Sequence, residues 1–150
     1  MKTVLIALSV VLAAACGGSS NGTTDRLANF TGSGGNASVT TTVSPTCPVL
    51  GGQSGTRTYS ITFAPTTGAD LQWTSAEGCV YKFNVSGNTA SLSNAPVSCN
   101  FTLNGFAVSA TWTSYTATTT DGRNLAIATA GTGSALLQTC PFTETGTATR

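Results

Sequence analysis

Alternation of apolar and polar residues with a period of two runs through this chain and most constrains its fold. Tyr59, Ile61 and Phe63 alternate with hydroxyl-bearing residues. The same spacing recurs at Leu71/Trp73, Tyr81/Phe83/Val85, Val108/Ala110/Trp112 and Leu125/Ile127. Because successive side chains of a β-strand point to opposite faces, each run predicts a strand with one buried face.

Short turn signals separate these runs. Ser86-Gly87-Asn88, Asn104-Gly105 and Asp121-Gly122 lie between consecutive runs, and such residues are typical of tight connections between antiparallel strands. Strands therefore recur about every 10 residues. The pattern predicts an all-β fold, an antiparallel meander of about eight or nine short strands that forms a small barrel or a sandwich.

The first residues of the chain have the pattern of an export signal. After Lys2, the run from Val4 to Leu12 is almost wholly apolar, and Ala13-Ala14-Ala15 precedes Cys16. A positive start, an apolar run and small residues are the three parts of a secretory signal peptide. The run is shorter than the roughly 20 apolar residues of a membrane-spanning helix. We therefore expect residues 1–15 to be a signal peptide.

The segment Leu12-Ala13-Ala14-Ala15-Cys16 resembles the lipobox of bacterial lipoproteins. This resemblance implies that Cys16 carries acyl chains such as palmitate and becomes the new N-terminus. Gly17 rather than Asp after the cysteine implies an outer-membrane destination in a Gram-negative host. Residues 16–24 then form the lipidated cysteine and a flexible Gly/Ser linker, and residues 25–150 form a single β domain. A secreted or periplasmic protein is the alternative.

Four cysteines remain once Cys16 is assigned to the lipid: Cys47, Cys79, Cys99 and Cys140. An even number of cysteines in an exported domain predicts two disulfides. Three pairings are open, and we prefer Cys79–Cys99 with Cys47–Cys140, because the first joins neighbouring strands and the second joins the early and late parts of the domain. Without histidine or a Cys-x-x-Cys pair, no metal site is predicted.

Charged residues are few and nearly balanced, with six Lys and Arg against five Asp and Glu. This composition offers no basic face for nucleic acid. The absence of histidine removes the usual general base of hydrolytic enzymes, and Asp70 and Asp121 lie in predicted turns. We predict no catalytic residues, no cofactor and no nucleic-acid partner.

The large aromatic residues are the remaining candidates for ligand contact: Trp73, Tyr81, Trp112 and Tyr115. Together they could line an apolar pocket, but a role as the bulk of the core is favoured. Tyr115 has the opposite parity from Trp112 and is therefore expected to be exposed.

The Thr- and Gly-rich meander, with Gly-Cys-x-Tyr-x-Phe-x-Val at residues 78–85, resembles small exported bacterial lipoproteins and is loosely similar to lipocalin-like barrels. Two functions remain open. The chain is a membrane-anchored structural or interaction module with a protein partner, or it binds a small apolar ligand inside a barrel. An enzyme is the least favoured interpretation.

Overall fold

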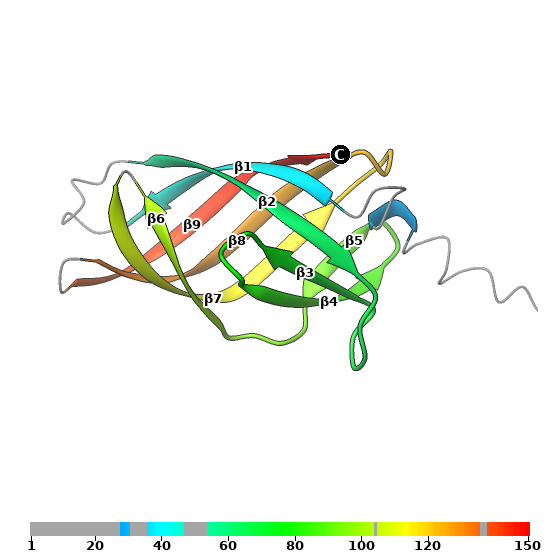
Figure 1. The fold of residues 1–150 in the computed structure, drawn as a ribbon, viewed down its shortest axis with the longest axis horizontal. Coiled ribbons are helices and arrows are strands. Elements are labelled where there is room, and N and C mark those ends of the chain that lie inside the picture. Colours follow the sequence, from blue (N-terminus) through cyan, green and yellow to red (C-terminus); the bar gives the residue numbers. More distant parts are fainter. Residues whose placement is uncertain (1–27, 31–35, 47–53, 104, 136–137) are drawn as a thin grey trace, which may run out of the picture.

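Nine antiparallel strands make up most of the part of the chain that the structure describes (Figure 1). The structure, a computed structural model, describes residues 28–30, 36–46, 54–103, 105–135 and 138–150. The strands are β1 (Asn36–Pro45), β2 (Gly55–Ala64), β3 (Leu71–Ser75), β4 (Val80–Ser86), β5 (Thr89–Leu92), β6 (Val97–Leu103), β7 (Phe106–Thr118), β8 (Asn124–Ala135) and β9 (Gln138–Thr149). The predicted all-β meander is confirmed.

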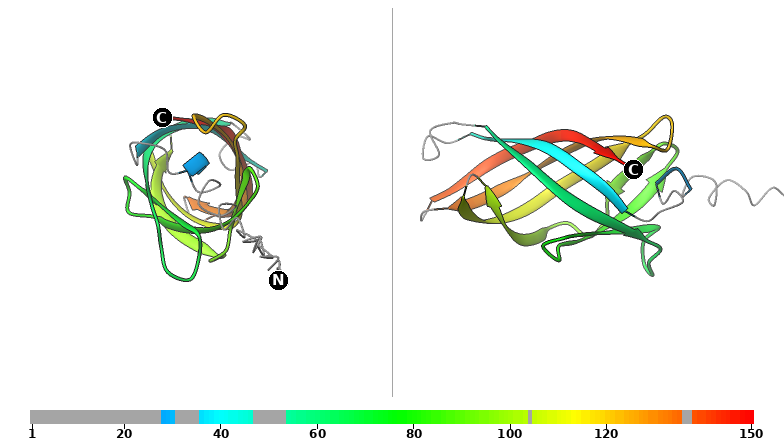
Figure 2. Two further views of the ribbon diagram at one scale, coloured as in Figure 1. Left: turned by 90° about the vertical axis from the view of Figure 1, so that its right-hand side faces the viewer. Right: turned by 45° about the horizontal axis from the view of Figure 1, so that its top comes forward.

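The sheet closes on itself. Its strand order is β5-β4-β3-β2-β1-β9-β8-β7-β6, and β5 also pairs with β7. The view along the molecule in Figure 2 shows the resulting ring of strands. Of the two predicted architectures, the chain therefore forms the barrel, which leaves fewer exposed strand edges than a sandwich would.

Strand β7 is long enough to pair with two different strands along the same edge. Its residues 106–112 pair with β6, and its residues 116–118 pair with β5. The β5–β7 pairing therefore closes the ring at the end of the barrel that holds β3, β4 and β5, whereas β6 lies along the other half of β7. Within the described residues, β2 meets β3 only from Ile61 to Ala64, and β6 pairs only with β7. We call the junction between residues 55–60 and β6 the β2–β6 seam, since no strand ladder crosses it.

The alternation of inward and outward side chains along β7 shifts by one residue at a β-bulge. The register with β8 shifts between Trp112 and Ser114, so Thr113 is an extra residue that moves every later side chain to the other face. Tyr115 is consequently buried, with 2% of its surface exposed. The expectation that Tyr115 is exposed was wrong, because parity was counted through the bulge. On β8, a β-carbon at Gly131 would overlap the carbonyl of Thr111, so only glycine lets the two strands approach this closely here.

The barrel interior is the hydrophobic core. Every apolar run predicted from alternation faces inward, and the side chains of Trp73, Trp112 and Phe83 are fully buried. A helical turn at residues 28–30 lies in one mouth of the ring (Figure 2). Its Phe30 is completely buried, and the backbone oxygen of Asn29 accepts a hydrogen bond from Arg150 Nη2 at 2.9 Å. The helical turn is thus held in this mouth by a buried side chain and by a hydrogen bond from the C-terminal residue.

Candidate functional site

A polar cluster lies inside the otherwise apolar barrel, centred on Glu144 of β9. The Glu144 carboxylate is 1% exposed. It accepts hydrogen bonds from Thr41 on β1, from Thr129 Oγ1 at 3.4 Å and from Trp112 Nε1 at 3.4 Å. Arg57 Nη1 lies 3.5 Å from Glu144 Oε1. Four strands besides β9 therefore supply partners to one carboxylate, which satisfies the strong need of a buried charge for polar contacts.

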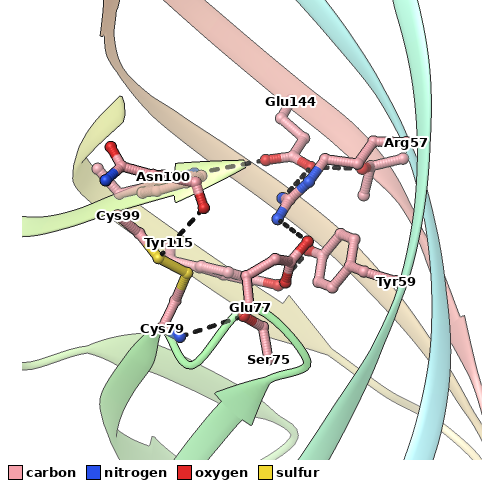
Figure 3. Close-up of polar contacts among 11 residues, drawn as sticks. Arg57, Tyr59, Ser75, Glu77, Cys79, Cys99, Asn100, Tyr115 and Glu144 are labelled. Carbon is pink, nitrogen blue, oxygen red and sulfur yellow. Dashed lines mark hydrogen bonds and ion pairs between the residues drawn. A yellow bond between two sulfur atoms is a disulfide. The ribbon is translucent and has the colours of Figure 1, made fainter. Parts of the chain in front are cut away.

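Arg57 of β2 connects this cluster to the wall of the barrel (Figure 3). Its Nη2 donates to Glu77 Oε1 at 3.1 Å. The guanidinium carbon lies 4.0 Å from the centre of the Tyr59 ring and 4.2 Å from that of Phe101, so aromatic rings cover its flat surface. Burial lowers the pKa of Arg57, but the oxygen of Tyr59 and the two carboxylates outweigh burial and raise it above the ordinary value. Arg57 is thus held as a cation.

Two tyrosine hydroxyls meet beside this cluster. Tyr59 Oη and Tyr115 Oη are 3.2 Å apart and buried. The ring of Tyr115 also packs against Tyr81 at 5.2 Å and Trp73 at 5.6 Å between ring centres. Burial raises the pKa of Tyr59, Tyr81 and Tyr115, because the charged phenolate is poorly solvated in the interior. All three hydroxyls therefore remain protonated in the folded barrel at neutral pH.

The turn between β3 and β4, residues 76–79, covers the β2–β6 seam. Glu77 reaches Arg57 from this turn, with 29% of its side chain exposed. Cys79 forms a disulfide with Cys99 of β6, with 5.7 Å between the α-carbons, and its N–H donates to Ser75 Oγ at 3.3 Å. The turn is therefore fastened to β2 by an ion pair and to β6 by a covalent bond (Figure 3).

The pKa of Glu77 follows from these contacts. Burial raises it, but hydrogen bonds from Ser75 and from the Glu77 backbone, together with the Arg57 charge, outweigh burial, so the pKa lies below the ordinary value. Glu77 is therefore ionised at neutral pH and can act as the outer counter-ion of Arg57.

The cysteine predictions are borne out in part. The Cys79–Cys99 disulfide is confirmed, and within the described residues one disulfide is found rather than two. Cys140 is buried, whereas Cys47 lies outside the described residues, as does Cys16. The Cys47–Cys140 bridge and the lipidation of Cys16 therefore stay predictions.

The four aromatic candidates come together, but as packing partners. Trp73 contacts Tyr115, and Tyr81 contacts both Tyr115 and Trp112, with ring centres 5.2–5.6 Å apart. Edge-to-face pairs at such distances stabilise a core. The contacts among the described aromatic residues are those of a packed interior, as the sequence analysis favoured.

Arg57 and Glu144 are functional candidates that sequence reasoning missed. The alternation of the two strands indicated that both side chains face inward. Arg57 points to the same face of its strand as Tyr59, and Glu144 points to the same face as Phe142. A charged residue on an otherwise apolar strand face is expected to be either exposed or paired across the interior, and parity alone identifies the face but not the partner.

Other features of the described residues give weaker indications of a functional site. No three His, Cys, Asp or Glu side chains come together there as a metal site. No helix in this part has the length and apolarity needed to cross a bilayer. A hollow of about 280 Å³ lies where the β7–β8 connection meets the wall. Its lining residues are Thr118, Thr119, Thr120, Asn124, Leu125, Ala126 and Thr147.

Comparison with protein families, with curated proteins and with solved structures finds no match to this chain. The buried Arg57–Glu144 pair and the turn that carries Glu77 therefore define the candidate site by geometry alone.

Proposed function

We propose that this chain is an exported lipoprotein whose barrel is held at a membrane surface through Cys16 and acts there as an interaction module. The lipobox-like segment before Cys16 and the Gly/Ser-rich residues after it support the anchor. Such a linker lets a folded domain move relative to its attachment point. The barrel then meets its partners with its outer wall.

The observation that carries the interaction role is the chemistry of that wall. The six strands β1, β2, β6, β7, β8 and β9 contain two charged residues, Arg57 and Glu144, and both are buried in the barrel. Outward positions are mostly Thr, Ser and Ala. The register places Thr40 between Thr58 and Thr147. A wall without charge lacks the electrostatic repulsion that keeps most protein surfaces apart, and its hydroxyls can donate and accept hydrogen bonds.

The packed interior supports the same proposal. Tryptophan, tyrosine and phenylalanine rings contact one another across the described part of the barrel, and the Arg57–Glu144 pair lies among them. Side chains that pack in this way serve stability. The outer wall is then the surface on which a protein partner would be recognised.

Site-specific photo-crosslinking in native membranes tests this role. A crosslinker at Thr42 or Thr145, which lie opposite each other on β1 and β9, should give a discrete adduct with one protein partner. The matched control is exposed Thr67 in the β2–β3 connection, which should give none. Identical adducts from all three positions, or none from the wall, would contradict the proposal. A small molecule retained in the purified barrel would instead support the ligand-binding alternative.

A further inference from the structure

The Arg57 guanidinium is shared between two carboxylates in an unequal way. Nη1 faces the buried Glu144 at 3.5 Å, and Nη2 donates to the partly exposed Glu77 at 3.1 Å. Nε is buried and has no hydrogen-bond partner within the described residues. A buried N–H without a partner is energetically unfavourable, so this arrangement leaves a strong donor unused in the folded state.

The unused donor Nε shares one edge of the guanidinium with Nη2, the nitrogen that donates to Glu77. Nε and Nη2 present two parallel N–H groups, and this fork matches the two oxygens of one carboxylate. Glu77 engages one of the two donors. A carboxylate that is free to choose its orientation could accept from both, and would gain a hydrogen bond that the tethered Glu77 does not make.

Arg57 lies on the part of β2 that borders the β2–β6 seam. At the β2–β6 seam no strand ladder crosses between residues 55–60 and β6, and the β3–β4 turn is fastened to both strands there. Glu77 is 29% exposed while Arg57 is 4% exposed, so Glu77 is the more solvent-accessible member of this ion pair (Figure 3).

We propose that the Nε/Nη2 edge of Arg57 is a binding site for the carboxylate of a small organic acid, and that Glu77 is its resident occupant. The incoming carboxylate displaces Glu77 toward solvent and accepts hydrogen bonds from both donors. Glu144 stays in place through Thr41, Thr129 and Trp112 and keeps the guanidinium oriented. The rings of Tyr59 and Phe101 cover its flat surface, so that only a ligand approaching the edge can bind. This site is independent of the proposed outer-wall interaction.

Glu77→Ala vacates the site and provides the direct test, with acetate as the probe. The mature E77A protein should show a saturable increase in Tm when acetate replaces chloride at constant ionic strength. In NMR spectra, the Nε–H signal of Arg57 should shift with the same midpoint, while the signals of the chain's other arginines stay unchanged. Wild type should bind acetate at least about tenfold more weakly, since Glu77 competes; a tenfold ratio corresponds to about 1.4 kcal/mol.

Two controls make the result specific. Asp121→Ala removes the same charge from an exposed turn and should show no preference for acetate over chloride. In the E77A background, Arg57→Lys removes the fork and should abolish the response. The proposal is overturned if acetate and chloride affect E77A equally, if the Arg57 Nε–H signal does not move, or if the lysine variant binds acetate as well as its parent. Should the lysine variant fail to fold, the Nε–H signal of E77A alone decides.

Discussion

Arg57 and Glu144 form an ion pair of 3.5 Å inside the barrel, where 4% and 1% of their side-chain surfaces are exposed. Each residue also has partners of its own, Glu77 for the arginine and three hydrogen-bond donors for the glutamate. Through Glu77, the Arg57–Glu144 pair therefore links the β3–β4 turn to β9. Strand β1 lies between β2, which carries Arg57, and β9, which carries Glu144. The role of the pair in stability can be separated from that of its neighbours by substitution.

Arg57→Leu should destabilise the barrel more than Glu144→Gln. The first leaves Glu144 as a buried charge without a cation, which costs about 3–5 kcal/mol. The second leaves Arg57 with Glu77 as a counter-ion, so we expect a loss of about 2 kcal/mol. Urea denaturation of both variants measures the difference. The double variant Arg57→Met/Glu144→Leu should recover most of the loss, since no buried charge remains. Equal losses for the single variants would contradict this description of the cluster.

Tyrosine ionisation should occur only when the barrel unfolds. The chain has three tyrosines, all buried and with raised pKa values in the folded state. The unfolded chain releases these protons near pH 10, so it binds fewer protons than the folded state at higher pH. The free energy of unfolding must therefore fall as pH rises above about 10. Tyrosinate absorbance should rise in one cooperative step that coincides with loss of the far-UV circular dichroism of the barrel. A gradual rise in a folded protein would show that the hydroxyls are accessible.

Glu77 should make the barrel sensitive to acid. Its pKa is lower in the folded state than in the unfolded chain, so its contribution is present above the unfolded pKa of about 4.3. That contribution is lost as pH falls through the folded pKa. Because the side chain is partly exposed, the effect is small, about 0.5–1 kcal/mol. Glu77→Gln should be less stable than wild type at pH 7 and equal to it at low pH. A difference that persists in acid would indicate that packing, not charge, is involved.

Deletion of Thr113 should disrupt the barrel. This extra residue lets both Trp112 and Tyr115 point inward. Without it, one half of β7 must turn its apolar side chains outward. We expect loss of the cooperative thermal transition, whereas Thr113→Ala, which keeps the bulge, should change the free energy of unfolding by less than about 1 kcal/mol. A deletion variant that melts as wild type does would contradict the assigned bulge.

The Cys79–Cys99 disulfide should stabilise the barrel mainly by restricting the unfolded chain. The two cysteines are separated by 20 residues, and a loop of this size is worth about 3 kcal/mol. Cys79→Ala/Cys99→Ala should lose about this amount in urea denaturation. The single variant Cys99→Ala should lose as much, because either change opens the same loop. A loss below about 1 kcal/mol would indicate that the seam is held by its other contacts.

The sequence predicted what depends on local chemistry. Alternation identified the strands, and the turn at Gly87 lies as expected between β4 and β5, with a positive φ that favours glycine. Tyr115 was misplaced because a bulge leaves no signal in a Thr- and Ser-rich strand. Arg57 and Glu144 lie far apart in sequence, and their pairing depends on β1 lying between β2 and β9, an arrangement that parity does not specify.

The mass of the mature N-terminus tests the central claim, that the barrel is anchored through Cys16. The protein should be purified from the membrane of its own host and analysed by native and peptide mass spectrometry. We expect a chain that begins at Cys16 and carries a diacylglyceryl or triacyl modification. A chain that begins at an unmodified Cys16 or at Gly17 would contradict the claim and would make this a freely exported barrel.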